Sequence, residues 1–180
     1  MTDRFPPLNS VSEALRSREQ VPRRFYQVID HPAPLAGSEF PSGFRDWAGF
    51  AQLGFHHIVC LSSERPNYDP APLTFLAVCE LDDLGVVPLP SEPRQEAARI
   101  HGIARQIVDA LQGGEGVLVH CAAGRGRTGT VLGVALRMLG FEGPQVIEYL
   151  NELHVERSGK GWPEGPWQAR VARDWPKLPR

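Results

Sequence analysis

Apolar and polar residues along the chain follow two periods, one typical of strands and one typical of helices. Short apolar runs predict strands over Phe25–Ile29, His57–Leu61, Thr74–Leu81 and 117–119. Longer segments with apolar residues three or four positions apart predict helices over 44–51, 100–111, 128–139, 146–153 and 163–175. Because strands and helices succeed one another, the pattern predicts an α/β fold with a mainly parallel central sheet, flanked by helices on both faces.

The start of the chain lacks this periodicity. We expect residues 1–23 to form a loosely ordered N-terminal lead-in with one short helix (Val11–Arg18), and residues 24–180 to form a single domain. A chain of 180 residues is long enough to bury a sizeable core in one domain.

Composition narrows the setting of the protein. The formal net charge of −2 gives no bulk field that would recruit nucleic acid or a membrane surface. No apolar run is long enough for a membrane span, and the first residues lack the apolar segment of a signal peptide. The three cysteines are an odd number without metal-ligand spacing, which favours reduced thiols and a cytoplasmic location. Cys60 and Cys79 lie in apolar runs, and we expect both in the core, although either could trap an oxidised Cys121 as a disulfide.

The segment 117–133 contains the strongest chemical signal. An apolar strand leads into Cys121, a glycine-containing loop follows, and Arg127 and Thr128 precede an apolar helix. Backbone N–H groups of such a loop form a concave nest for an anion, and the helix N-terminus adds its positive dipole end. Arg127 adds a planar fork for two phosphate oxygens. These groups also stabilise a thiolate, so the pattern predicts a phosphate site with a nucleophile at its base.

The run His120–Gly129, HCAAGRGRTG, resembles the signature loop of the cysteine-dependent protein tyrosine phosphatases, and most closely their compact dual-specificity branch. The resemblance implies a protein tyrosine phosphatase-like fold. It also implies that Cys121 is a nucleophile that forms a phosphocysteine, that Arg127 binds phosphoryl oxygens and that Thr128 assists turnover. His120 would hold the loop by hydrogen bonds rather than act as a base. The substrate-binding residues would be Ala122, Ala123, Gly124, Arg125, Gly126 and Arg127.

The general acid is harder to locate. The family places an aspartate on a mobile loop before the cysteine, and the leaving group needs such a proton donor. Asp83 follows the strand that ends at Leu81, and we favour it as the acid. Glu92 and Asp82 remain alternatives, and all three carboxylates also fit purely structural roles at a strand end or in a first helical turn.

Weaker resemblances extend over residues 25–175. The segment Leu35–Pro41 is similar to the stretch that follows the first strand in bacterial and atypical dual-specificity phosphatases, and Leu53–Leu61 is similar to their step from a helix through a glycine into a strand. The segment Arg157–Gln168 could rim the site, and Gln168 resembles a glutamine that the family has near the catalytic loop. We expect the tryptophans of this region, Trp162, Trp167 and Trp175, to be packing residues. For His56 and His57 we favour a helix-to-strand corner over metal binding.

These observations predict a phosphoric monoester hydrolase that acts on phosphotyrosine. Whether it also acts on phosphoserine and phosphothreonine stays open. Its partners would be a phosphorylated protein or a small phosphomonoester, with no nucleic acid, no membrane, no cofactor and no metal. The alternatives are a phosphoinositide or other non-protein phosphatase of the same fold, and a catalytically weak phosphate-binding module. A rhodanese-type enzyme fits the continuation after Arg127 less well. Arg125 bears on the choice, because it either contacts a second phosphate or is solvated.

Overall fold

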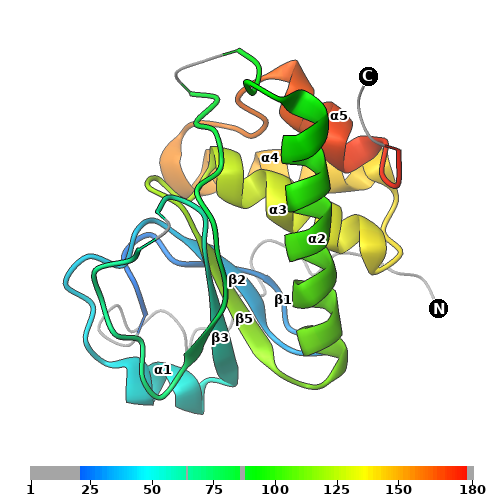
Figure 1. The fold of residues 1–180 in the computed structure, drawn as a ribbon. Coiled ribbons are helices and arrows are strands. Elements are labelled where there is room, and N and C mark those ends of the chain that lie inside the picture. The colour runs from blue at the N-terminus through cyan, green and yellow to red at the C-terminus, as the bar shows by residue number, and fades with distance from the viewer. Residues whose placement is uncertain (1–20, 64, 86–87, 178–180) are drawn as a thin grey trace. The chain divides into compact units, whose positions relative to one another are not determined.

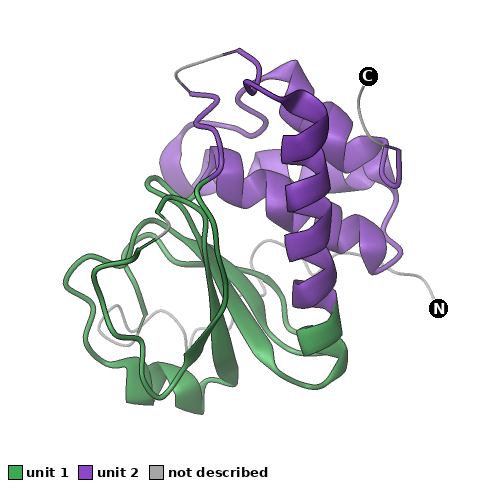
Figure 2. Cartoon of the chain, viewed as in Figure 1, with its two compact units in different colours: residues 1–80, 109–124 green, residues 81–108, 125–180 purple. Residues whose placement is uncertain are grey.

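The computed structural model describes residues 21–63, 65–85 and 88–177, which divide into two compact units (Figure 1, Figure 2). Unit 1 comprises Met1–Glu80 and Asp109–Gly124, and unit 2 comprises Leu81–Val108 and Arg125–Arg180. The helix predicted within the N-terminal lead-in lies outside the described residues. The prediction of one domain over 24–180 stays a prediction.

Unit 1 contains a five-stranded sheet whose order is β1-β2-β5-β3-β4. The strands are β1 (Tyr26–Ile29), β2 (Leu35–Ser38), β3 (Phe55–Cys60), β4 (Thr74–Val78) and β5 (Gly116–His120). β1 pairs with β2 antiparallel, whereas β2, β5, β3 and β4 pair with their neighbours in parallel. The predicted α/β class with a mainly parallel sheet is therefore confirmed, and so are the four predicted strands, although β4 ends at Val78 and not at Leu81.

The strand β2 was not predicted. Its sequence, LAGS, has neither the β-branched residues nor the alternation that mark a strand. The chain is nevertheless extended there, because Leu35–Ser38 pairs in register with Val117–His120 on one side and with β1 on the other. Gly37 is needed at this pairing, since a Cβ at that position would meet the ring of Tyr26. Tertiary pairing, rather than local propensity, forms this strand.

Aromatic side chains build the core of unit 1 beside the sheet. The short helix α1 (Trp47–Gln52) begins at Asp46, whose carboxylate accepts a hydrogen bond from the Gly49 backbone N–H at 2.9 Å. The rings of Phe50 and Phe55 stack with their centroids 4.3 Å apart. The buried members of this cluster are Ala36, Trp47, Phe50, Phe55, Ile58, Leu73 and Leu118. The predicted helix over 44–51 is confirmed, with its start three residues later.

The remaining helices are α2 (Pro93–Gln112), α3 (Gly126–Met138), α4 (Gly143–Ser158) and α5 (Pro166–Arg173). All four were predicted, but α2 begins well before the apolar stripe that indicated it. Pro93 stands at the first position of α2, where a missing backbone N–H costs nothing. Pro144 and Pro166 stand in the first turns of α4 and α5 for the same reason. Gly159 ends α4 with a φ of 69°, the left-handed conformation typical of a helix C-terminus.

Small residues on α3 allow close packing within unit 2. A Cβ at Gly129 would lie 2.6 Å from the ring of Trp162, and one at Gly133 would lie 2.9 Å from the Ala172 Cβ. Trp162 is fully buried on this glycine face, and its indole N–H donates to the Gly126 carbonyl at 3.3 Å. The predicted packing role of Trp162 is thereby confirmed, and Trp167 is also buried. Trp175 is half-buried.

The two cysteines outside the loop have different environments. Cys60 ends β3 and is fully buried, as predicted. The prediction for Cys79 is wrong, because this residue follows the end of the edge strand β4 and is only half-buried. Within the residues that the structure describes, none of the helices has the length and apolar character required to cross a bilayer.

Candidate active site

Cys121 lies directly after β5, a strand paired on both sides. Its side chain is buried, with 2% of the residue exposed. The start of the following loop is tied to the segment after β2, because the Phe40 backbone N–H donates to the Ala122 carbonyl at 3.0 Å. The carboxyl end of a central parallel strand is the usual place for a ligand in such sheets. The nucleophile candidate therefore stands on a rigid element of unit 1.

His120 is fully buried and connects the loop to a neighbouring part of unit 1. The Tyr68 hydroxyl and the His120 Nε2 are 2.6 Å apart, and the His120 Nδ1 is 3.4 Å from the Cys121 carbonyl oxygen. Burial raises the pKa of Tyr68, so its hydroxyl stays protonated and donates to Nε2. The proton on Nδ1 is then directed at the Cys121 carbonyl. This arrangement orients the backbone at Cys121 and leaves no free ring nitrogen for base catalysis.

Burial lowers the pKa of His120 to about 4, so unfolding below neutral pH is accompanied by proton uptake at this residue. The stabilising contribution is present above pH 6.5 and is lost as the pH falls toward 4. Between pH 7 and pH 5, the free energy of unfolding of the unmodified protein should fall by about 2 kcal/mol more than that of His120→Gln. Urea unfolding at both pH values measures it, with the exposed His31→Gln as control. An unchanged pH dependence in His120→Gln would contradict the assignment.

Gly124 has a steric reason to be glycine. Its φ is +66°, in the left-handed region. A Cβ at this position would collide with the Ser38 backbone and lie 2.7 Å from the Glu39 backbone nitrogen. The Tyr26 hydroxyl donates to the Gly124 carbonyl at 2.8 Å, which holds the loop against the β1–β2 pair. The positive φ of Gly124 and its close contact with the Ser38 backbone both agree with a loop that turns its backbone N–H groups toward an anion.

In unit 2, Arg127 contacts the segment that contains the candidate acids. Its Nη2 lies 2.9 Å from the Asp83 Oδ2, and its Nη1 donates to the Leu81 carbonyl at 3.4 Å. The Arg127 side chain is 10% exposed and that of Asp83 is 48% exposed. The Gly85 backbone N–H donates to the other carboxylate oxygen of Asp83 at 3.1 Å, which forms a tight turn. Of the three carboxylates considered from sequence, Asp83 is the one that pairs with Arg127.

The two alternative acids have other contacts. The Asp82 carboxylate accepts hydrogen bonds from the Ser91 backbone N–H at 2.8 Å and from its hydroxyl at 3.2 Å. Glu92 is exposed just before α2, and its backbone carbonyl accepts the first helical bond from Glu96. Asp82 therefore bridges the ends of its loop, and Glu92 stands at a helix start. β4 ends at Val78, so Asp82 does not end a strand, and Glu92 lies one residue before α2 rather than in its first turn.

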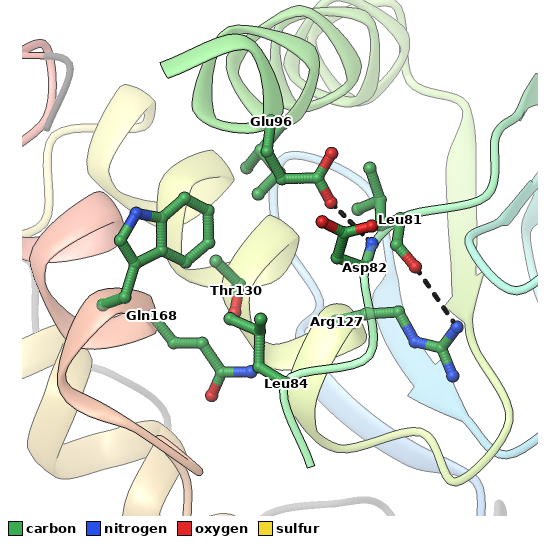
Figure 3. A pocket seen from close by; sticks show the side chains of 9 residues that line it. Leu81, Asp82, Leu84, Glu96, Arg127, Thr130 and Gln168 are labelled. Atoms are coloured by element: carbon green, nitrogen blue, oxygen red, sulfur yellow. Dashed lines mark hydrogen bonds between the residues drawn. The ribbon is translucent and has the colours of Figure 1, made fainter. Parts of the chain in front are cut away.

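A small pocket lies against Arg127 in unit 2 (Figure 3). Its lining combines charged, amide and apolar side chains: Leu81, Asp82, Leu84, Glu96, Ile100, Arg127, Thr130, Trp167 and Gln168. Glu96 was missed at the sequence level. It is 2% exposed, and one of its carboxylate oxygens accepts a hydrogen bond from the Asp82 backbone N–H at 2.7 Å. A signal was present, because Glu96 lies four residues before Ile100 on the apolar stripe.

Burial raises the pKa of Glu96, and the Asp82 backbone N–H and Arg99 oppose this shift. The Arg99 guanidinium lies 3.1 Å from the second carboxylate oxygen of Glu96. Glu96 thus ties α2 to the start of the Asp82–Gly85 turn. We read it as a structural anchor of that turn.

Arg125 has a partner that the sequence did not indicate. Its guanidinium forms an ion pair with the Glu164 carboxylate, with 2.9 Å between Nε and Oε1. The alternative of a simply solvated Arg125 is therefore wrong. The Gln168 side-chain oxygen accepts from the Glu164 backbone N–H at 2.7 Å. The segment predicted to rim the site contacts the start of α3 through the Arg125–Glu164 pair and through the Trp162 indole N–H on the Gly126 carbonyl. Thr128 is fully buried, and its hydroxyl has no hydrogen-bond partner among the described residues.

His56 and His57 lie at the start of β3. The His57 ring bonds to the Thr74 hydroxyl and to the Glu115 carboxylate, both at 2.9 Å, and the Gly116 backbone N–H donates to the His56 Nδ1 at 3.3 Å. Among the described residues, no three side chains of the metal-ligating types gather at one place.

Comparison with known families gives one match that covers most of the chain. The protein-family model described as "Swiss Army Knife protein, DSP-PTPase phosphatase domain" matches residues 22–160. None of the curated proteins compared with the chain matches it.

Solved structures agree with this match. The active form of Tk-PTP is 25% identical and aligns over 78% of this chain and 89% of its own, with a TM-score of 0.56. Kinase associated phosphatase is 17% identical over 87% of this chain and 95% of its own, with a TM-score of 0.60. The catalytic core of the PP-IP phosphatase SIW14 from S. cerevisiae is 16% identical over 83% of this chain and 84% of its own, with a TM-score of 0.55. The last two similarities show the fold alone.

Proposed function

Since the chain belongs to the DSP-PTPase phosphatase domain family of Swiss Army Knife proteins, we propose that it hydrolyses phosphomonoesters through a phosphocysteine at Cys121. The substrate we propose is phosphotyrosine, with phosphoserine and phosphothreonine open, on a protein or as a small molecule. The continuity of the signature run from His120 to Gly129 supports this assignment. The ion pair of Arg127 with Asp83 is the observation that carries it, because it joins the proposed phosphate ligand to the proposed acid.

In the first step, the Cys121 thiolate attacks phosphorus and the bond between phosphorus and the ester oxygen breaks. Arg127 and the N–H groups of the loop stabilise the charge on the phosphoryl oxygens. The ester oxygen leaves with the proton of the Asp83 carboxyl. In the second step, water attacks phosphorus, the bond to sulfur breaks and inorganic phosphate is released, while Asp83 takes the proton from that water. The unpartnered Thr128 hydroxyl is free to donate a hydrogen bond to the departing sulfur.

The contacts of Asp83 support its role as a carboxyl that changes partners. In the free protein its carboxylate pairs with the Arg127 guanidinium, and half of its side chain is exposed. A phosphoryl group that binds Arg127 takes over that guanidinium and releases the Asp83 carboxyl from it. Asp83 then carries its proton close to the bound phosphate.

We expect Asp83→Asn to make kcat/KM depend more steeply on the leaving group. Hydrolysis of phosphotyrosine, whose phenol has a pKa of about 10, should fall by about 100-fold, because a general acid contributes at least that much. Hydrolysis of p-nitrophenyl phosphate should fall much less, since its leaving group needs little help from a proton. Asparagine keeps an acceptor for Arg127, so the contact itself is largely preserved.

Asp82→Asn and Glu92→Gln are the matched controls. Both remove a carboxylate from the same segment without touching Arg127. Steady-state kinetics on a series of aryl phosphates separates the three variants. The quantity compared is the slope of log kcat/KM against the pKa of the leaving group. An equal slope for Asp83→Asn and the unmodified protein would refute the role of Asp83, and a steeper slope in either control would assign the role to that residue.

A further inference from the structure

Both the side chain and the backbone of Glu164 are held by hydrogen bonds. Its carboxylate pairs with the Arg125 guanidinium through both Nε and Nη2. Its backbone N–H donates to the buried Gln168 side chain at 2.7 Å. The pair is largely shielded from water, with 23% of the Arg125 side chain and 14% of the Glu164 side chain exposed. Both Arg125 nitrogens donate to the same oxygen, Oε1, and a shielded charge-assisted contact of this kind is stronger than an exposed ion pair.

The glycines around Glu164 leave room for its carboxylate. A Cβ at Gly126, the first residue of α3, would collide with the Glu164 carboxylate and lie 3.0 Å from the Gln168 Nε2. A Cβ at Gly85 would lie 3.6 Å from the Glu164 Oε1. The carboxylate therefore lies at the N-terminus of α3, where the helix dipole favours negative charge. Two independent attractions, the guanidinium and the helix end, keep it there.

The two arginines of the loop have different carboxylate partners. Arg127 pairs with the half-exposed Asp83, and in the proposed mechanism the substrate phosphate takes the place of that carboxylate. Arg125 pairs with the shielded Glu164, and its charge is neutralised before any substrate arrives. Without Glu164, Arg125 would offer a free guanidinium two residues from Arg127, suited to a second phosphate. The loop therefore has one guanidinium, that of Arg127, for a phosphoryl group that displaces Asp83.

We propose that Glu164 is a specificity-determining residue that occupies Arg125 and so restricts the site to substrates without a neighbouring second phosphate. This inference rests on the proposed phosphatase function and narrows its substrate class to simple phosphomonoesters. The Glu164 carboxylate stands where a second phosphate would otherwise bind. It also repels any second anionic group on the substrate.

The test compares inorganic phosphate and inorganic pyrophosphate as inhibitors of p-nitrophenyl phosphate hydrolysis. In Glu164→Gln, pyrophosphate should inhibit about tenfold more strongly relative to phosphate than it does in the unmodified protein, as measured by the ratio of the two inhibition constants. This factor is the value of one charge-assisted contact. The double variant Arg125→Gln/Glu164→Gln should return the ratio to that of the unmodified protein, since it restores the local net charge. Glu152→Gln removes the same charge from an exposed position of α4 and should leave the ratio unchanged.

The outcomes separate this inference from the proposed function. An unmodified protein that does not hydrolyse p-nitrophenyl phosphate refutes the function itself. Hydrolysis with no shift in Glu164→Gln refutes the specificity role and leaves the function standing. A shift of equal size in Glu164→Gln and in the double variant, or in Glu152→Gln, shows a general charge effect and also refutes the role of Arg125.

Discussion

Replacing Cys121 by serine should abolish turnover while phosphate binding is retained. A serine hydroxyl is a far weaker nucleophile than a thiolate and has no general base beside it, because His120 is buried, neutral and already bonded through both nitrogens. We expect kcat for p-nitrophenyl phosphate to fall by about 10⁴-fold or more. The ligands that bind phosphate, Arg127 and the loop N–H groups, are unchanged, so calorimetry should detect inorganic phosphate on the variant.

Cys79→Ser is the matched control for this substitution. Cys79 is half-buried after β4 and has no part in the proposed chemistry, so its variant should keep the turnover of the unmodified protein. Mass spectrometry of acid-quenched protein should find a phosphorylated residue in the unmodified chain and none in Cys121→Ser. Substantial residual turnover in Cys121→Ser would contradict the phosphocysteine route.

Replacing Arg127 by lysine should cost about 10³-fold in kcat although the charge is retained. Lysine presents a point charge, whereas the guanidinium offers two parallel donors that fit two phosphoryl oxygens. Arg127 reaches Asp83 and the Leu81 carbonyl with two separate nitrogens, whereas lysine has one, so the segment that bears the proposed acid is held less firmly. Steady-state kinetics with p-nitrophenyl phosphate measures the loss.

Arg105→Lys makes the same change at an exposed position of α2 and should leave kcat unchanged. A loss of less than tenfold in Arg127→Lys would show that Arg127 supplies only charge. A loss of the same size in both variants would point to a general effect on folding, which circular dichroism of the two proteins would detect.

Much of the fold could be predicted from local pattern. The predicted strands and helices were found because each carries its own apolar period. The failures share one cause, which is that the missing information lies elsewhere in the chain. β2 is extended because Leu35–Ser38 fits between β1 and β5, and Cys79 is half-buried because β4 is an edge strand. Neither pairing nor edge position is visible in a run of four or five residues.

The candidate site shows the same division. The order Cys121, loop, Arg127 and Thr128 is local, and the sequence by itself determined that this chain carries a signature run for phosphate chemistry between an apolar strand and an apolar helix. Only the tertiary structure decided which carboxylate faces which arginine. It paired Asp83 with Arg127 and Glu164 with Arg125, across separations of 44 and 39 residues. The physical reason is that backbone periodicity is a property of neighbours in sequence, whereas ion pairs depend on neighbours in space.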